Sequence, residues 1–151
     1  MAEHRLHRLS TDDTDGMDSF DGAHTELTEL IIGCAYTVHN ELGPGFIETI
    51  YENALAIELE KQGIRFKRQV PVNVFYSGRQ VGMHRLDLTA EDKVIVELKA
   101  KDSFSESDEA NVLSYLKATG FTIELLLNFG TPSLKIKRLG LDPRWKSVKS
   151  V

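Results

Sequence analysis

The segment RLDLTAEDKVIVELKA, residues 85–100, decides how this chain folds. Two apolar runs flank the charged residues 91–93, a pattern that predicts two antiparallel strands joined by a short turn. Side chains alternate between the two faces of a strand, so Glu97 and Lys99 point to the same side. Asp87 lies near the end of the preceding strand. The segment therefore predicts two carboxylates and an ammonium group on an otherwise apolar strand pair.

The register of this strand pair follows from the face that must be buried. A turn with an odd number of residues, three or five, places Asp87 opposite Glu97 and Leu88 opposite Val96. An even number would mix buried and polar faces, so we expect the odd turn. Like charges directly across a strand pair destabilise it, and this register calls for a positive group between Asp87 and Glu97. The alternative is a solvated polar face with a weak ion pair to Lys99.

Length and composition bound the class of protein. A chain of 151 residues is long enough for one domain with a sizeable core. No apolar run approaches the ~20 residues that span a bilayer, and the N-terminus does not read as a secretory signal. Cys34 is the single cysteine, which excludes an intrachain disulfide and favours a reducing, cytoplasmic location. On an apolar helix stripe, Cys34 is expected to be a small core residue.

Charge is distributed unevenly along the chain. The formal net charge is −5, and residues 1–26 hold two basic and seven acidic side chains. Residues 133–151, in contrast, hold six basic side chains and one acidic side chain. A chain that is balanced after its first 26 residues but ends in a basic segment predicts modest, salt-sensitive affinity for nucleic acid.

The order of the apolar patterns predicts an α/β fold. Residues 1–23 have the composition of a disordered acidic tail, residues 24–139 form the expected domain, and residues 140–151 read as a basic C-terminal tail. The expected elements are two helices (25–42, capped by Thr25, and about 46–62), three strands (64–76, 81–88 and 94–100), a helix from Ser105 or Ser107 to about Thr119, and two strands (121–129 and 134–138). Pro71 suits an edge strand or a bulge.

Two further pairs of residues stand out on the expected helices. Glu48 and Tyr51 follow Gly45 at intervals of three and share a helix face, so both could point into a cleft. Alternatively, Gly45 is the N-cap and Glu48 occupies the third helical position, where free amides favour a carboxylate. Asn111 and Tyr115 share a face of the later helix, and on pattern alone such a pair is usually polar surface.

Several segments together resemble the GxxExxY family, a small-domain branch of the PD-(D/E)XK nuclease-like superfamily. They are GPGFIETIYENAL, RQVPV, RLDL with VIVELKA, YLKATG and LLLNFG, which follow one another in this order. The resemblance as a whole covers residues 26 to about 139. The resemblance implies a restriction-endonuclease-like core, a mixed central sheet flanked by helices in the order ααβββαββ. This is the order that the apolar patterns predict.

The resemblance also implies roles for the candidate residues. Asp87, Glu97 and Glu48 would hold one or two Mg²⁺ or Mn²⁺ ions, and Lys99 would be the motif lysine that orients water or stabilises developing charge. Family members often carry Gln where this chain has Asn111, four residues before a Tyr. The expected contacts with substrate are Tyr51, Asn111, Tyr115, Lys135, Lys137 and Arg138.

We therefore expect a metal-dependent nuclease that hydrolyses phosphodiester bonds in DNA or RNA. Two alternatives stay open: a non-catalytic module that binds nucleic acid, and a protein-interaction domain whose acidic cluster only completes a polar surface. Homo-oligomers formed through a sheet edge also stay open, and no membrane partner is expected.

Overall fold

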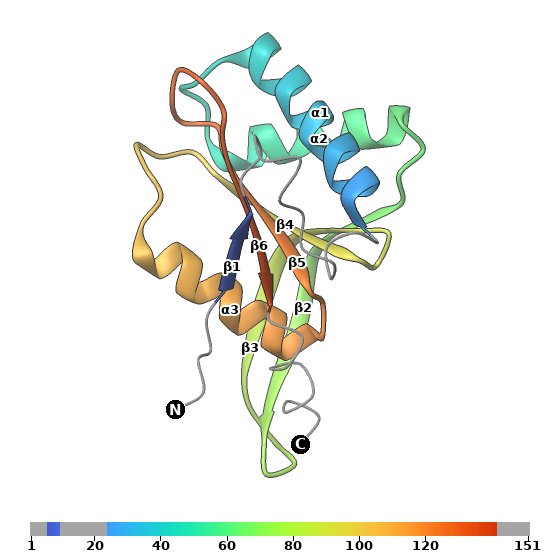
Figure 1. The fold of residues 1–151 in the computed structure, drawn as a ribbon, viewed down its shortest axis with the longest axis vertical. Coiled ribbons are helices and arrows are strands. Elements are labelled where there is room, and N and C mark those ends of the chain that lie inside the picture. The colour runs from blue at the N-terminus through green and yellow to red at the C-terminus, as the bar shows by residue number, and fades with distance from the viewer. Residues whose placement is uncertain (1–5, 10–23, 142–151) are drawn as a thin grey trace.

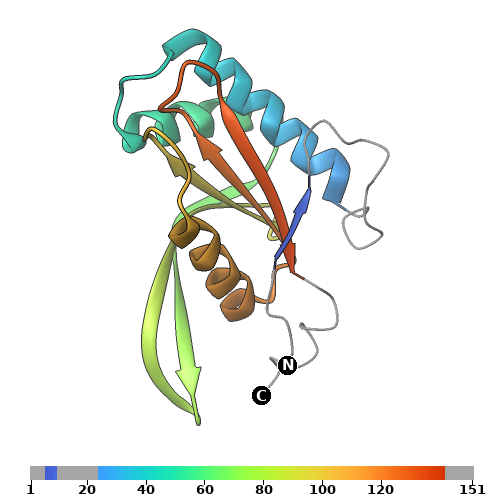
Figure 2. The same cartoon turned by 60° about the vertical axis from the view of Figure 1, so that its left-hand side comes forward.

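A computed structural model describes residues 6–9 and 24–141 as one mixed sheet with helices on both faces (Figures 1 and 2). The elements in chain order are β1 (Leu6–Leu9), α1 (Thr25–Leu42), α2 (Glu48–Lys61), β2 (Phe66–Tyr76), β3 (Arg79–Ala90), β4 (Val94–Lys99), α3 (Glu106–Thr119), β5 (Ile123–Asn128) and β6 (Lys135–Leu141). Within these ranges, no helix combines the length and apolar character needed to cross a membrane.

The strand order in the sheet is β1-β6-β5-β4-β3-β2. The β4–β5 pair is parallel and the other four pairs are antiparallel. A parallel pair needs a crossover connection, and α3 supplies it between β4 and β5. The predicted α/β class and the order ααβββαββ are confirmed, with β1 added before them.

The structure differs from the sequence predictions at the N-terminal side. Leu6–Leu9 forms β1 against β6, although the composition of this region predicted no ordered structure. The other residues of the predicted tails, 1–5, 10–23 and 142–151, lie outside the described part of the chain. Thr25 is the first residue of α1 and His24 is its N-cap, so the prediction that Thr25 caps this helix is wrong.

The predictions for the residues that interrupt, begin or end the later elements are confirmed. Pro71 lies in β2, an edge strand, where a missing backbone N–H costs least. Ser105 is the N-cap of α3 and forms a capping box with Asp108. Gly120 ends the same helix in the left-handed conformation, with φ of 83°.

Two apolar clusters form the core, one on each face of the sheet. The larger cluster packs α1 and α2 against the sheet and includes Cys34, which is buried as predicted. The smaller cluster packs Val112 and Leu116 of α3 against the other face, including Ile95 and Leu126. Figure 1 shows α1 and α2 together on one side of the strands and α3 on the other.

The long hairpin of β2 and β3 changes faces at one point. Leu88 packs in the larger cluster and Leu86 in the smaller one, although residues two apart on a regular strand share a face. Between them, the ladder of β2 and β3 lacks the pair Gln69–Asp87, and Gln69 has a φ of 52°. The outer part of the hairpin therefore turns out of the sheet and runs beside α3 (Figure 2).

The chain just after β4 is held by the end of β5. The side-chain oxygen of Asn128 accepts hydrogen bonds from the backbone N–H groups of Lys101 (3.0 Å) and Gly130 (3.1 Å). Its amide nitrogen donates to the carbonyl oxygen of Lys101 at 2.8 Å. A Cβ atom at Gly130 would lie within 3 Å of backbone atoms of Ala100 and Lys101, so only glycine fits here.

We expect Gly130→Ala to lower the free energy of unfolding by about 1–3 kcal/mol, because the added methyl group overlaps backbone that cannot move aside. Gly33→Ala is the matched control, since Gly33 lies in α1 with open space around it and Ala is the better helix former by about 1 kcal/mol. Urea denaturation of both variants measures the difference. Equal stability of Gly130→Ala and the unaltered protein would contradict this account.

Candidate functional site

The two central carboxylates lie where β3 and β4 part. The strands pair from Ala90–Val94 to Leu88–Val96 around a three-residue turn, as the sequence predicted. Beyond this point, the backbone N–H of Asp87 donates to Oε2 of Glu97 at 3.2 Å. The backbone N–H of Leu98 donates to Oδ2 of Asp87 at 2.9 Å. At this point carboxylate oxygens, instead of backbone carbonyl oxygens, accept the hydrogen bonds between the two strands. These two bonds hold the carboxylates close together.

This pair carries more negative charge than its surroundings compensate. Glu97 is 5% exposed, and burial raises its pKa to about 9, with the charge of Asp87 adding to the effect and Lys99 opposing it. Two like charges in this register call for a positive group, as the sequence argument stated. The positive charge of Lys99 lowers the pKa of Glu97 by less than burial and Asp87 raise it.

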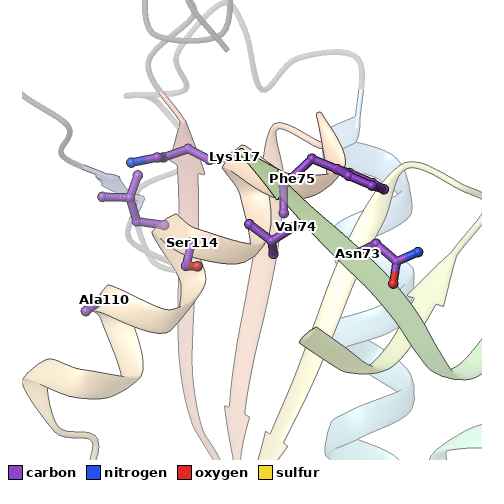
Figure 3. Close-up of a pocket in the computed structure, with 8 residues that line it drawn as sticks. Asn73, Val74, Phe75, Ala110, Ser114 and Lys117 are labelled. Atoms are coloured by element: carbon purple, nitrogen blue, oxygen red, sulfur yellow. The ribbon is translucent and has the colours of Figure 1, made fainter. Parts of the chain in front are cut away.

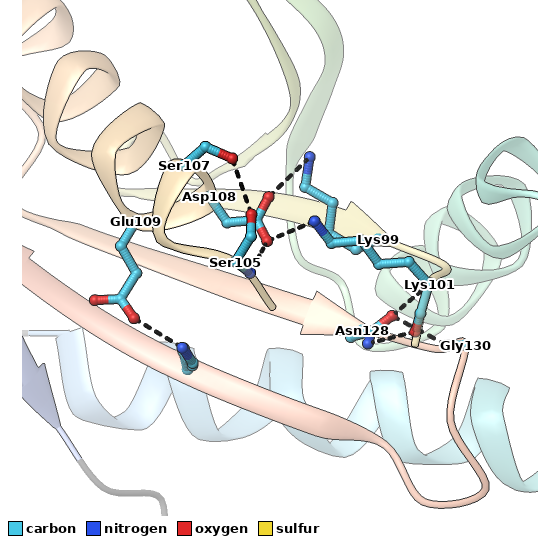
Figure 4. Close-up of polar contacts among 9 residues, drawn as sticks. Lys99, Lys101, Ser105, Ser107, Asp108, Glu109, Asn128 and Gly130 are labelled. Atoms are coloured by element: carbon cyan, nitrogen blue, oxygen red, sulfur yellow. Dashed lines mark hydrogen bonds and ion pairs between the residues drawn. The ribbon is translucent and has the colours of Figure 1, made fainter. Parts of the chain in front are cut away.

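Lys99 belongs to a small network at the start of α3 (Figure 4). Its Nζ lies 3.8 Å from Oδ1 of buried Asp108, whereas Nζ of Lys101 lies 2.7 Å from Oδ2 of the same residue. Burial acts to raise the pKa of Asp108, but hydrogen bonds from Lys101 and from the Ser105 backbone outweigh it, and the pKa is lowered. Asp108 is therefore a carboxylate that fixes the start of α3 beside Lys99.

Sequence reasoning missed Asp108 and Lys101 as neighbours of the site. The signal available was the capping-box spacing from Ser105 to Asp108, which marks the start of a helix but not the lysines that its carboxylate meets.

Glu48 reaches the site from the start of α2. The N-cap of α2 is Ile47, so Glu48 is the first helical residue and the prediction that Gly45 caps the helix is wrong. The side chain is exposed, yet partial desolvation raises its pKa, with Lys99 opposing the shift and Asp87 adding to it. Glu48 thus lies within electrostatic reach of both residues.

Tyr51 is fully buried, in contrast to the expected place in a cleft wall. Its hydroxyl donates to the carbonyl oxygen of Gly43 at 2.5 Å and accepts from the N–H of Phe46 at 3.2 Å. Its ring stacks on Phe129, with 4.6 Å between the ring centroids. Tyr51 therefore holds the loop that leads into Glu48, and it has no surface to offer a substrate.

Tyr115 of α3 packs its ring against His84 and lies within electrostatic reach of the carboxylates. Burial raises the pKa of its hydroxyl to about 12, and the charges of Glu97, Glu124 and Asp87 add to the effect. Asn111 lies one helical turn earlier and is exposed. The expected Asn–Tyr pair thus has one half-buried member within electrostatic reach of the carboxylates and one at the surface.

Glu124 of β5 is a third carboxylate near the pair, and sequence reasoning did not identify it. It is completely buried, and neither of its carboxylate oxygens has a hydrogen-bond partner among the described residues. Burial raises its pKa well above the usual value, and Glu97 and Asp87 add to the shift. The signal was a single acid within the apolar strand IELLLN.

The basic residues of β6 differ in how far they are exposed to a ligand at the surface. Lys135 is exposed. Nζ of Lys137 lies 2.7 Å from Oε2 of Glu109 and 4.9 Å from the ring centroid of Phe104. Arg138 was predicted, with Lys135 and Lys137, as one of the residues of which some contact a nucleic-acid backbone, and at 4% exposure it offers little surface for such a contact. Leucine-rich strands flank this part of β6, and its register with β5 turns Arg138 away from solvent.

The donor set of the site fits a divalent metal ion. Asp87 and Glu97 offer adjacent carboxylate oxygens with unbalanced negative charge, and Glu48 adds a carboxylate nearby. Within residues 6–9 and 24–141, however, no three His, Cys, Asp or Glu side chains close around a common metal position. Mg²⁺ needs only one or two protein carboxylates when waters and phosphate oxygens complete its coordination.

Comparison with known families gives one match. The family model described as the PD-(D/E)XK nuclease superfamily matches residues 25–139, which is more than half of the chain and contains every residue of the site. No curated protein and no solved structure matches the chain.

The raised pKa of Glu97 makes stability depend on pH in a defined direction. Folded Glu97 keeps its proton up to about pH 9, whereas the unfolded chain releases it near 4.5, so this group's contribution to stability falls as pH rises through that window. Glu97→Gln lacks this decline. We expect its stability relative to the unaltered protein to grow, by up to about 1.4 kcal/mol per pH unit, in metal-free urea titrations from about pH 5 to about pH 8.

Glu124→Gln is expected to change stability in the same direction, because its carboxyl group is also buried with a raised pKa. Glu60→Gln, at an exposed position of α2, is the matched control and should parallel the unaltered protein. Parallel pH profiles for all four proteins would show that neither buried carboxyl group has a raised pKa.

Proposed function

Because the chain belongs to the PD-(D/E)XK nuclease superfamily, we propose that it is a divalent-metal-dependent nuclease that hydrolyses phosphodiester bonds in nucleic acid. The observation that carries this proposal is the Asp87–Glu97 pair, held at the point where β3 and β4 part, with Lys99 two residues further along β4. Burial and the charge of Asp87 raise the pKa of Glu97, so its ionised form is costly in the metal-free protein, and a divalent ion with phosphate as a further ligand would stabilise that form.

Asp87 and Glu97 would hold Mg²⁺ or Mn²⁺, with Glu48 completing the set from the start of α2. When bound, the ion would neutralise charge on the phosphate and make a water molecule easier to deprotonate. Glu48 is suited to accept a proton from water, because partial desolvation and the charge of Asp87 raise its pKa from the ordinary carboxyl value. Tyr51 fixes the loop before Glu48 and thereby sets its position.

Lys99 is the group proposed to stabilise negative charge on the reacting phosphate. The 3.8 Å separation from Asp108 is long, while Lys101 neutralises Asp108 at 2.7 Å. Lys101 thus satisfies the carboxylate and leaves the Lys99 ammonium group free to turn toward a phosphate oxygen. Tyr115 and Asn111 are proposed to form the wall of the site on the α3 side, and exposed Lys135 is retained as a contact with the nucleic-acid backbone.

One observation favours a second candidate, a module that binds nucleic acid without cleaving it. No three acidic side chains among the described residues surround a single metal position, so the site is not assembled in advance. Cleavage and metal binding therefore need separate measurements.

The nuclease proposal is tested by incubating the protein with labelled single-stranded and double-stranded DNA and RNA, with Mg²⁺ or Mn²⁺ and with a chelator. We expect metal-dependent cleavage that falls by about 100-fold or more in Glu97→Gln and Lys99→Ala, because the first removes a carboxylate that would hold the ion and the second removes the ammonium group that would meet the developing charge. Glu60→Gln should retain the full rate. No cleavage of any substrate by the unaltered protein would reject the enzyme and leave the binding module.

Metal binding is tested without reference to activity. A cation that binds only the folded state stabilises it by mass action, and at about ten times its Kd it adds about 1.4 kcal/mol, or roughly 3 °C in Tm for a domain of this size. We expect such a shift with Mg²⁺ or Mn²⁺ for the unaltered protein and Glu60→Gln, but not for Asp87→Asn or Glu97→Gln. A shift that is equal in all four proteins would place the cation elsewhere.

A further inference from the structure

The outer part of the β2–β3 hairpin, residues 70–86, is a projecting arm that the proposed chemistry does not use. We call it the hairpin arm. It begins directly beyond the Gln69–Asp87 break and extends past the sheet to the turn at residues 77–78 (Figures 1 and 2). Its exposed large side chains are Phe75 (62% exposed), Tyr76 (73%), Val81 (63%) and Met83 (49%).

The charge of this part of the chain is entirely positive. Residues 61–86 contain six Lys or Arg side chains and no Asp or Glu, in a protein whose net charge is −5. The three basic residues at the base of the hairpin pair with carboxylates from other elements. On the arm, Arg79 and Arg85 are exposed and neither takes part in an ion pair within the described residues. The arm thus offers unneutralised cations beside exposed aromatic rings.

A groove separates the arm from α3 (Figure 3). Its volume is about 390 Å³, toward the lower end of the range for small-molecule sites. Val74 and Leu113 form apolar parts of its lining, while Asn73, Ser114 and Lys117 add polar groups. Phe75 also lines the groove, and this mixture suits a ring with polar edges, such as a nucleobase.

We propose that the hairpin arm binds an unpaired segment of nucleic acid, with bases stacking on Phe75 and Tyr76 and with Arg79 and Arg85 contacting phosphates. This inference rests on the proposed nuclease function and gives its substrate class as nucleic acid that contains a single-stranded segment. Stacking on aromatic rings accepts any base but needs the base unpaired, and arginine meets phosphate with paired donors. A flexible strand lying along the arm is led to Asp87, which stands at the arm's base.

The same surface is poorly suited to a second copy of the chain. β2 is the edge strand of the sheet, and Pro71 within it lacks the backbone N–H that a second strand would need. Proline on an edge strand is a common guard against such pairing. The unpaired cations of the arm, Arg79 and Arg85, lie on β3 and favour a polyanion as the partner.

The test is fluorescence anisotropy with a labelled single-stranded oligonucleotide of about 20 nucleotides, its duplex and the matching RNA, in a chelator so that no cleavage occurs. We expect the single strands to bind more tightly than the duplex. Phe75→Ala with Tyr76→Ala should weaken single-strand binding by roughly 10- to 100-fold. Arg79→Gln should lower the slope of log affinity against log salt by about 0.7.

Two matched controls separate stacking from simple apolar docking and from net charge. Val81→Ser with Met83→Ser removes exposed apolar area from the same arm without removing a ring, and Lys61→Gln removes one charge from α2 outside the arm. Both should bind single strands as the unaltered protein does. The inference is overturned if the aromatic variant binds normally, if both double variants lose affinity equally, or if the arm variants change only the oligomeric state.

The outcomes for the arm and for the nuclease are distinguishable. Single-strand binding that depends on the rings, without cleavage, supports the arm and rejects the nuclease. Cleavage that is unaffected by the aromatic substitutions supports the nuclease and overturns the arm.

Discussion

The hydrogen bond from the backbone N–H of Leu98 to the carboxylate of Asp87 is the constraint on which the site depends. A regular ladder would satisfy this N–H with a carbonyl group and would leave Asp87 on an ordinary polar face. Here the carboxylate of Asp87 takes the place of that carbonyl group, and the carboxylate of Glu97 in turn accepts a hydrogen bond from the backbone N–H of Asp87. Two acids are thereby fixed side by side by main-chain groups, which cannot rotate away as flexible side-chain partners could.

Residues around the end of β5 hold the backbone on both sides of the carboxylate pair. The side chain of Asn128 and the absence of a side chain at Gly130 hold the backbone just after Lys99. Phe129, between them, stacks on Tyr51, whose hydroxyl holds the loop before Glu48. The end of β5 thus connects the lysine side of the site to the glutamate side.

The parts of the fold that follow from local pattern could be predicted from the sequence. Burial of one face fixes the register at Leu88–Val96, the missing N–H of Pro71 indicates an edge strand, and Ser105 marks the start of α3. Asp87, Glu97 and Lys99 could be identified because charge interrupts an apolar strand pair.

What could not be predicted depends on residues far apart in the chain. Burial of Tyr51 requires Phe129, and burial of Arg138 follows from its place beside β5. Glu124 resembles any acid at a strand end until α3 covers it. The change of face at Gln69 has no local signal, since glutamine rarely adopts a positive φ. In each case a neighbour supplied by the tertiary fold overrides the local preference.

The missing pair between Gln69 and Asp87 also bears on local stability. It lies where the hairpin arm leaves the inner sheet, and little of the arm beyond it is buried. Segments with few buried contacts open at lower free energy than the core, so we expect amide hydrogens of the arm to exchange faster than those of β4 and β5. Under the proposed function, such local opening would release and recapture a long polymer while the carboxylates stay in place.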